Sequence, residues 1–181
     1  MTEIRPGKLL VASPLLEDPN FRRAVVLVCM YSDEGTMGVV LNRPLEIPVV
    51  DRLAAWSELV ASPAVFFDGG PVEPNLVVAL ARGDSDRLST SIEPGFGLVD
   101  LETDPHAVPG AFEVVRLFGG YAGWGAGQFE SELGEDAWYI VDALPGDAFT
   151  EEPDTLWREV LRRQSGDLQM LAYYPERLEL N

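Results

Sequence analysis

The stretch from residue 7 to residue 44 constrains the fold most strongly, because it consists of apolar runs separated by turn-forming residues. Runs at 9–12 and 24–31 are rich in Val and Leu, as β-strands usually are. The second run is apolar at successive positions, so both of its faces should be covered, which is typical of a central strand. The chain is therefore predicted to begin with an ordered β-sheet.

Turn signals and prolines follow these strands. Residues 32–35 (SDEG) form a turn signal and 38–42 is again apolar, so we expect a β-hairpin. Pro44 and Pro48 are expected to interrupt the sheet, because proline cannot donate a ladder hydrogen bond. From 49 to 60 the apolar positions fall near one helical face and an Asp occupies the first turn, so a helix is predicted.

The remaining segments mix strands and helices without a repeating period. Further strands are predicted at 64–67, 76–81, 96–101, 113–118 and 138–141. Helices are predicted at 125–133, with Phe129 and Leu133 facing inward, and at 155–164. The second helix is expected to be amphipathic, with an apolar face made by Leu156, Trp157, Val160 and Leu161. The polar segment 82–95 is expected to be a flexible loop.

The order of these elements favours an α+β fold. Strands and helices do not alternate strictly, which disfavours a doubly wound parallel sheet. We expect a mixed, largely antiparallel, twisted sheet flanked by helices. At 181 residues and without a linker or internal repeat, the chain 1–181 is predicted to be a single domain.

Charge and hydrophobicity exclude several classes of protein. The net charge is −17, and residues 121–181 alone carry 13 acidic against 4 basic side chains. Direct nucleic-acid binding is therefore not expected, since it depends on Lys and Arg to neutralise phosphates. The sequence has neither the run of roughly 20 apolar residues that a membrane helix needs nor a secretion signal, so we expect a cytoplasmic protein without a membrane partner.

Four blocks in one order resemble the bacterial AlgH/YqgE family. The first block comprises Gly7, Leu9, Leu10, Ala12, Pro14, Leu16, Asp18, Pro19 and Phe21. It is followed by LNRP at 41–44, FDGGPVEP at 67–74 and GYAGWGAGQFESE at 120–132, with Trp138 beyond. The blocks span most of the chain, which makes the resemblance far more specific than any single motif.

The resemblance implies a single α+β domain with a branching sheet. Members of the family are sometimes labelled transcriptional regulators; with this charge, such a role would act indirectly through a protein partner. The family often carries Cys-Glu-His after the second apolar run, whereas this chain has Cys29, Met30 and Tyr31. Any chemistry that depends on that Glu and His has no counterpart here.

The glycine-rich segment from Gly119 to Gly127 is one candidate ligand site. Amides at the start of a helix could receive an anion there, with Tyr121, Trp124 and Gln128 beside it. The segment lacks the dinucleotide fingerprint and the Gly-Lys-Ser/Thr ending of a phosphate loop. A tight turn beneath the two aromatic rings is the favoured interpretation.

Asn42 and Arg43 form a second candidate. The Arg43 fork could bind a carboxylate or phosphate, but an internal pair with Asp18 is favoured, and Asp18 is also expected to cap its own turn. Gly69 and Gly70 are expected to supply positive φ before Pro71, with an anion-binding nest as the alternative.

The nucleophile and metal candidates are weak. Cys29 lies in an apolar strand, where a packing role is favoured over reactivity, and a lone cysteine cannot form an internal disulfide. His106 is the only histidine and lies in a proline-rich loop. We therefore assign no catalytic residue, no metal and no cofactor.

Three functional hypotheses remain. The favoured one is a non-enzymatic protein that acts through contacts with a protein partner, with a homo-oligomer left open. The second is a small-ligand or nucleotide-binding module that uses Asn42, Arg43, Gly69, Gly70 and the Gly123–Gly127 loop. The third is a hydrolase or redox protein that uses Cys29.

Overall fold

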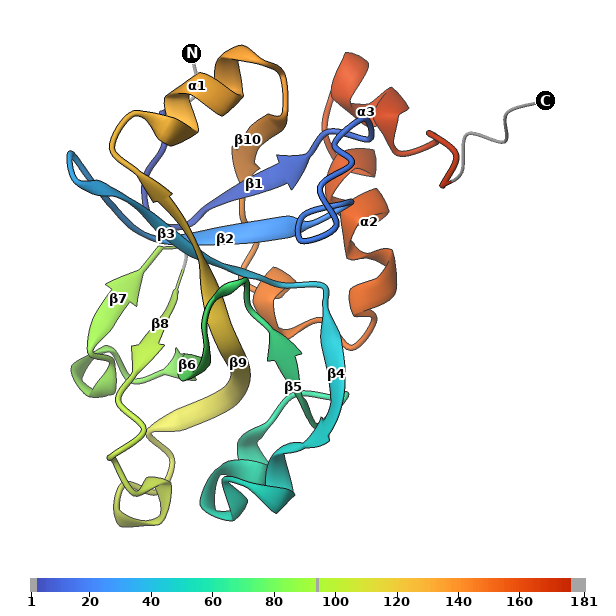
Figure 1. The fold of residues 1–181 in the computed structure, drawn as a ribbon. Helices are drawn as coiled ribbons and strands as arrows, with labels where there is room; N and C mark the ends of the chain where they lie inside the picture. Colours follow the sequence, from blue (N-terminus) through green and yellow to red (C-terminus); the bar gives the residue numbers. More distant parts are fainter. Residues whose placement is uncertain (1–2, 94, 177–181) are drawn as a thin grey trace.

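The computed structural model describes residues 3–93 and 95–176, in which the strands form one curled sheet (Figure 1). The strands are β1 (Lys8–Ala12), β2 (Val25–Ser32), β3 (Gly35–Val40), β4 (Pro44–Pro48), β5 (Val65–Asp68), β6 (Val72–Gly83), β7 (Thr90–Ile92), β8 (Phe96–Val99), β9 (Phe112–Gly125) and β10 (Trp138–Asp142). Their order is β10-β1-β2-β3-β9-β6-β8-β7, with β4 and β5 branching from the middle. Neighbouring strands are antiparallel except β5 and β9, so the expected α+β fold with a mixed, largely antiparallel sheet is confirmed.

The predicted hairpin is confirmed as β2 and β3. Its register shifts between Val28, which faces Gly38, and Met30, which faces Met37. Cys29 is the extra residue of this β-bulge. The bulge lies near the tip of the hairpin, where the buried part of β2 gives way to exposed residues.

The prolines at positions 44 and 48 do not interrupt the sheet, contrary to the prediction. They are the two ends of β4, which pairs with β5 alone. Proline is tolerated there because β4 is an edge strand, whose outer side makes no ladder hydrogen bonds. The register of the β4–β5 pair is irregular between the two prolines.

The single helix predicted over 49–60 is also wrong. The segment forms two short 3₁₀ helices, η1 (Val49–Asp51) and η2 (Ala54–Leu59), with Leu53 in a non-helical conformation between them. The Ser57 hydroxyl bonds to the carbonyl of residue 54 within η2, a local contact that competes with regular helix. In this segment only Val49 and Trp56 are buried, and Trp56 packs against a ring of β9.

The helices predicted at 125–133 and 155–164 agree more closely with the structure, whereas the other helical segments were not predicted as helices. The short 3₁₀ helices are η3 (Ser85–Arg87), η4 (Pro105–Ala107), η5 (Asp147–Phe149) and η6 (Pro153–Thr155), and the α-helices are α1 (Gln128–Gly134), α2 (Leu156–Arg162) and α3 (Asp167–Leu171). In α1, Phe129 is fully buried and Leu133 partly buried, as expected. The apolar face predicted for α2 is buried.

The segment 82–95 is more ordered than predicted, because it contains η3 and β7. Residue 93, directly after β7, also lies against the chain just before β1 and so closes the curl of the sheet. A Cβ added at Gly7 would lie 2.0 Å from the carbonyl oxygen of Glu93. Gly7 has a φ of 92°, so glycine is required there for both reasons.

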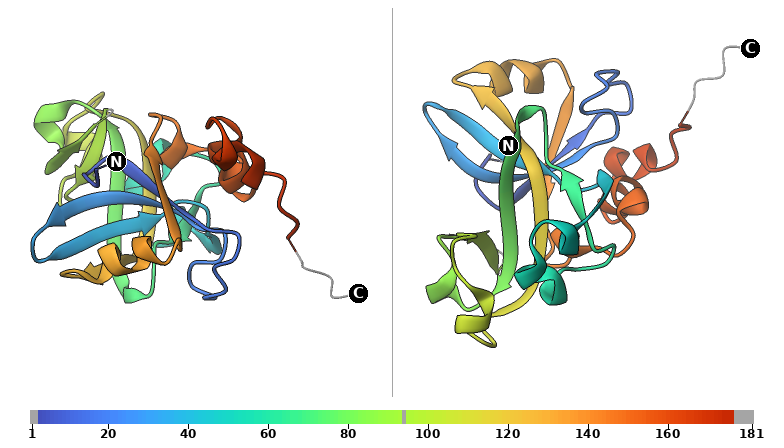
Figure 2. Two further views of the ribbon diagram at one scale, coloured as in Figure 1. Left: turned by 90° about the horizontal axis from the view of Figure 1, so that it is seen from above. Right: turned by 60° about the horizontal axis from the view of Figure 1, so that its bottom comes forward.

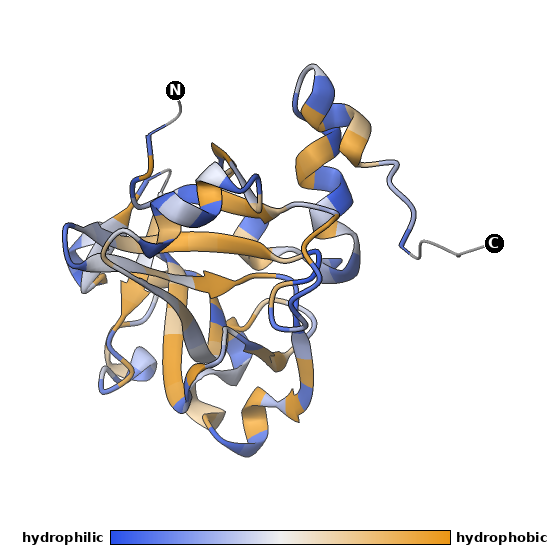
Figure 3. Ribbon diagram, turned by 45° about the horizontal axis from the view of Figure 1, so that its top comes forward, coloured by the Kyte–Doolittle hydropathy of each residue, from blue (hydrophilic) through white to orange (hydrophobic). Residues whose placement is uncertain are grey.

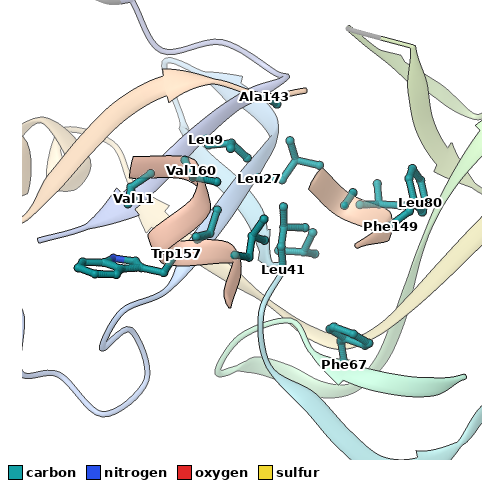
Figure 4. Packing of buried hydrophobic residues seen from close by; sticks show 14 of the residues in the cluster. Leu9, Val11, Leu27, Leu41, Phe67, Leu80, Ala143, Phe149, Trp157 and Val160 are labelled. Carbon is teal, nitrogen blue, oxygen red and sulfur yellow. The ribbon is translucent and has the colours of Figure 1, made fainter. Parts of the chain in front are cut away.

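Figure 2 shows the curled sheet from two further sides, and the hydropathy colouring of Figure 3 shows hydrophobic residues along its strands. The buried hydrophobic residues form three clusters against this sheet. The largest fills one side of the curl and includes residues of α2, as the close view shows for Trp157, Val160, Leu9 and Leu27 (Figure 4). The second cluster lies beneath α1, and the third lies beneath η2. In the described ranges, no helix has both the length and the apolar character needed to cross a membrane.

Candidate functional site

A groove of about 710 Å³ lies at the tip of the β2–β3 hairpin. Its lining comes from β2, β3, β9, the start of β6, β7 and the chain just before β1. Segments distant in sequence therefore meet here because the sheet curls back on itself. The groove has no Lys or Arg among its lining residues.

Glycines on neighbouring strands leave the groove open. Gly35 of β3 pairs with Gly125 of β9, and Met37 pairs with Gly123. A Cβ at Gly123 would meet only ordinary contacts at 3.6 Å or more, from Tyr121 and Val72. Because these two β9 positions have no side chain of their own, a ligand could approach the backbone there more closely than at other positions of the strand.

Methionine and tyrosine side chains supply most of the apolar surface. Met30 and Tyr31 are 51% and 41% exposed, respectively. Met37 and Tyr121 are partly buried against the largest core cluster. Flexible Met side chains beside rigid aromatic rings are suited to contact with apolar groups of varied shape.

Carboxylates surround these tyrosines. The Tyr31 hydroxyl donates to Glu130 Oε1 at 3.2 Å, and the pKa of Tyr31 is raised first by this bond, with further contributions from Asp33 and Glu3. The Tyr121 hydroxyl donates to Glu73 Oε2 at 3.3 Å. Its pKa is raised by burial and then by Glu73.

Glu34 itself lines the groove, which extends the acidic surroundings to the hairpin turn. The groove is thus an apolar surface with negative charge around it. Such an arrangement is complementary to a ligand that combines an apolar group with positive charge.

The three predicted residues of the glycine segment have different roles. Tyr121 and Trp124 both line the groove, but the Trp124 ring is largely buried in the cluster beneath α1. Trp124 Nε1 donates to Glu132 Oε2 at 2.8 Å, and Gln128 Oε1 accepts from the Gly125 amide at 3.2 Å. Gln128 and Glu132 therefore tie α1 to β9.

The tight turn predicted for this segment is wrong, because β9 continues through Gly125. Gly120 has a φ of 74°, and a Cβ there would lie 2.6 Å from the carbonyl oxygen of Gly70. Such glycines allow β5, β6 and β9 to approach one another closely within the sheet. A turn follows only at Gly127, which precedes α1 in the left-handed conformation.

Asn42 and Arg43 lie outside the groove. Asn42 accepts from the Val25 amide at 3.0 Å and donates to the Arg23 carbonyl at 2.8 Å, so its side chain fixes the turn before β2. Arg43 Nη2 donates to the Arg22 carbonyl at 2.6 Å. The pair predicted between Arg43 and Asp18 is wrong; Asp18 caps its own turn by accepting from the Asn20 amide at 2.9 Å, as expected.

Gly69 and Gly70 are buried at the end of β5. Their amides are taken by the Gly119 carbonyl and by Asp68 Oδ1, respectively, so they are not available as an anion nest. Gly70 has a φ of 147°, as predicted, but Gly69 does not have a positive φ. Gly69 is needed for close approach, since its Cβ would lie 2.3 Å from the Gly120 carbonyl oxygen.

Cys29 and His106 are not arranged as a catalytic pair. Cys29 is fully buried, and burial raises the pKa of its thiol from 9.0 to about 12. A thiol with such a pKa is a poor nucleophile at neutral pH. His106 lies in η4 and lines a different hollow, beside η2.

Metal-ligating side chains do not converge in the described part of the chain. Over residues 3–93 and 95–176, no group of three or more His, Cys, Asp or Glu residues is close enough to hold an ion. The carboxylates near the groove bond to tyrosine hydroxyls instead.

Sequence reasoning identified Tyr121 but missed the methionines and the acidic surroundings of the groove. Met30 was visible in the sequence only as part of an apolar strand. Its exposure depends on the bulge at Cys29 and on the closure of the sheet at Gly7. The acidic surroundings could have been inferred from the density of Asp and Glu around the hairpin turn.

Known proteins resemble this chain over nearly its whole length. A model of the AlgH-like family matches residues 9–169. A UPF0301 protein of Streptomyces coelicolor is 49% identical, covering 100% of this chain and 98% of its own, and one of Thermobifida fusca is 47% identical, covering 97% and 94%.

Two solved structures share the fold. A crystal structure of a protein from Corynebacterium diphtheriae gives a TM-score of 0.90 at 30% identity and covers 96% of this chain and 94% of its own. The solution structure of the AlgH protein from Pseudomonas aeruginosa gives a TM-score of 0.69 at 26% identity, with 97% and 98% covered.

Proposed function

This chain belongs to the AlgH-like family, and on that premise we propose that it is a non-enzymatic binding protein whose groove receives a basic, apolar segment of a partner protein. The observation that carries the proposal is the groove itself. It combines an open apolar surface, a glycine floor and surrounding carboxylates. A regulatory role would then operate through the partner.

Charge complementarity favours a basic segment over other occupants. Glu34, Glu73 and Glu130 lie at or beside the groove, and no cationic side chain lines it. The net charge of −17 adds a long-range attraction for basic partners and repels acidic ones. The apolar side chains of the segment would pack against Met30 and Met37.

The other two hypotheses have less support. Arg43, the Gly69–Gly70 pair and the Gly123–Gly127 segment lie in three separate places, which leaves a nucleotide module without a shared cavity. The buried Cys29 thiol has no base beside it in the hairpin, because the neighbouring positions are Met30 and Tyr31. Both observations favour a binding role.

A designed peptide tests the proposal. A synthetic peptide of alternating Lys and Leu should bind the full chain saturably in isothermal titration calorimetry, whereas its Glu–Leu counterpart should not. Gly123→Leu should weaken binding at least about tenfold, because the new side chain occupies the groove floor. Gly134→Leu is the matched control, since a side chain at Gly134 would meet nothing within 4 Å.

Two outcomes would contradict the proposal. Equal binding of the Lys–Leu and Glu–Leu peptides would remove the electrostatic argument. Equal affinity in the Gly123→Leu variant and the Gly134→Leu control would place the binding surface elsewhere. Circular dichroism of both variants establishes that the fold is retained.

A further inference from the structure

Four arginines gather at the opposite end of the β2–β3 hairpin from the groove. Arg22 and Arg23 precede β2, Arg43 follows β3, and Arg158 belongs to α2. The chain segment 174–176, which follows α3, lies against them. In a protein with 13 basic and 30 acidic residues, such a concentration of positive charge needs a physical explanation.

The arginines donate mainly to neutral carbonyl oxygens. Arg43 Nη2 donates to the Arg22 carbonyl at 2.6 Å, and Arg22 Nη2 donates to the Glu176 carbonyl at 2.5 Å. Arg23 Nη2 donates to the carbonyls of residues 174 and 175 at 3.0 and 2.6 Å. These bonds fix the guanidinium groups without neutralising them.

Among the described residues, one carboxylate forms an ion pair with the cluster, and the exposed Glu17 lines a neighbouring hollow with Arg22. Glu176 Oε1 lies 3.4 Å from Arg158 Nη2, and its side chain is 74% exposed. One solvated carboxylate against four guanidinium groups leaves an excess of positive charge. An exposed pair of this kind contributes little stability.

Arg23 is held in an unfavourable state. Its φ is 53°, in the left-handed region, and its Nη1 is buried without a hydrogen-bond partner among the described residues. Its guanidinium carbon lies 4.4 Å from the centre of the Trp157 ring. Burial and then the neighbouring Arg158 lower the pKa of Arg23, so an added anion nearby would relieve the repulsion between the two guanidinium groups.

A hollow of about 370 Å³ opens onto the cluster. It is lined by Pro19, Arg22, Arg23, Arg43 and Glu176. The arginines reach it from two separate segments of the chain. A planar carboxylate is satisfied by one guanidinium fork, whereas the oxygens of a tetrahedral phosphoryl group can accept from several donors in different directions.

We propose that Arg22, Arg23 and Arg43, supported by Arg158, form a binding site for a phosphoryl group in this hollow. The site is independent of the groove proposed to bind a protein segment. Within it, Arg43 and Arg22 bind the oxygens from the open side, and the Arg23 guanidinium, held by the carbonyls of residues 174 and 175, adds positive charge at the wall of the hollow. Glu176 is the electrostatic competitor of the bound anion.

Titration of the full chain with inorganic pyrophosphate tests this site. Nuclear magnetic resonance should show a saturable shift of the Trp157 indole N–H, because Arg23 lies over that ring. The indole signal of Trp56, which belongs to another cluster, should stay in place. Citrate should bind at least about tenfold more weakly, since its carboxylates are planar.

Two substitutions with opposite expected effects sharpen the test. Arg43→Gln should weaken pyrophosphate binding at least about tenfold, and Glu176→Gln should tighten it severalfold. Arg87→Gln, at an exposed arginine of η3, should leave it unchanged. The proposal is overturned if no saturable shift occurs below about 10 mM, if citrate binds as tightly, or if Arg87→Gln weakens binding as much as Arg43→Gln.

Discussion

At the scale of single residues, Glu132 joins two indole rings beneath α1. Its Oε2 accepts from Trp124 Nε1 at 2.8 Å and from Trp138 Nε1 at 3.0 Å. The two rings also pack edge to face, with Phe21 beside both. Glu132 is thus an acceptor for two largely buried donors, which assigns this signature glutamate to the architecture of the protein.

Replacement of Glu132 should be costly because two buried N–H groups would lose their acceptor. Glu132→Ala is expected to lower the free energy of unfolding by about 2–4 kcal/mol, as measured by urea denaturation. Glu132→Gln retains one acceptor oxygen and should lose less. A change beyond about 0.5 kcal/mol in the exposed Glu135→Ala control would show that the loss is not specific to the indole contacts.

Cys29 gives a prediction for alkaline pH. Burial raises its pKa in the folded state from 9.0 to about 12, so the unfolded chain releases the thiol proton first. The free energy of unfolding should therefore fall between pH 9 and 12, by about 1.4 kcal/mol per pH unit from this group. Below pH 9 the thiol is neutral in both states, and this contribution disappears.

The comparison with Cys29→Ala isolates the effect of the thiol. Tyrosines and Arg116 titrate in both proteins, so their contributions cancel in the difference between the two pH profiles. The wild-type profile should be steeper by one proton between pH 9 and 12. Parallel profiles would mean that the thiol is accessible to water in the folded state.

The sequence predicted the burial of Cys29 well but not the contacts of Arg43. A thiol in an apolar run on a central strand is buried in almost any packing, so local composition suffices. The partner of Arg43 depends on how the turn before β2 approaches the end of β3, which is a tertiary contact. For the same reason, the left-handed backbone conformation of Arg23 could not be predicted from the sequence.

At the scale of elements, β9 explains most of the difference between the predicted and the observed fold. Glycine density suggested a turn, because glycine in a strand usually weakens it. In β9 the glycines are needed for the close approach of β5 and β6. From the sequence alone, such a glycine-rich strand cannot be distinguished from a loop, because its neighbouring strands are not known.

Two glycines of β9 should respond differently to the same substitution. Gly120→Ala should lower the free energy of unfolding by about 2 kcal/mol or more, because φ is positive and the Cβ would lie 2.6 Å from the Gly70 carbonyl oxygen. Gly123→Ala should change it by less than about 1 kcal/mol, since the added Cβ would make only ordinary contacts at 3.6 Å or more. Thermal or urea unfolding measures both, and equal losses would contradict the described packing of β9.

For the 3₁₀ helices η1 and η2, the error was the opposite one, because the sequence predicted more regular structure than the chain forms. The apolar spacing over 49–60 matched a helix, but only Val49 and Trp56 are buried there. Helical periodicity over so short a stretch is outweighed by the fit of one large ring against β9. The apolar face of α2 was predicted correctly because its four buried residues recur over two turns.

At the scale of the whole molecule, Arg116 connects distant parts of the chain through the centre. Its side chain is fully buried, and burial lowers its pKa to about 10. Nη2 donates to the Ser62 carbonyl at 2.7 Å, and Nη1 donates to the carbonyls of Thr150 at 2.7 Å and Ala148 at 3.4 Å. The guanidinium also lies 4.3 Å from the centre of the Phe67 ring.

Arg116→Lys should destabilise the fold although it preserves the charge. An ammonium group cannot reach carbonyls on both sides as the guanidinium fork does, so at least one carbonyl loses its donor. A loss of about 1–3 kcal/mol in the free energy of unfolding is expected from urea denaturation. Arg82→Lys, in a half-exposed pair with Glu113, should cost less than about 0.5 kcal/mol, and the reverse ranking would contradict this role for Arg116.

The class of fold followed from the sequence, whereas the curl of the sheet did not. Strand runs, turn signals and the absence of alternation were sufficient for α+β. The groove depends on the contact of Gly7 with residue 93 and on the bulge at Cys29. Both features depend on contacts between segments that are separate in the sequence, so they could not be predicted from the sequence alone.

The edge strand β4 affects how readily copies of the protein associate at high concentration. β4 is exposed along its length and displays Leu45 and Ile47, which would invite a strand from another molecule. Proline at each end removes two of the amide donors that an intermolecular ladder would need. Addition of a strand from another copy is therefore disfavoured at this edge, although Leu45 and Ile47 are exposed there.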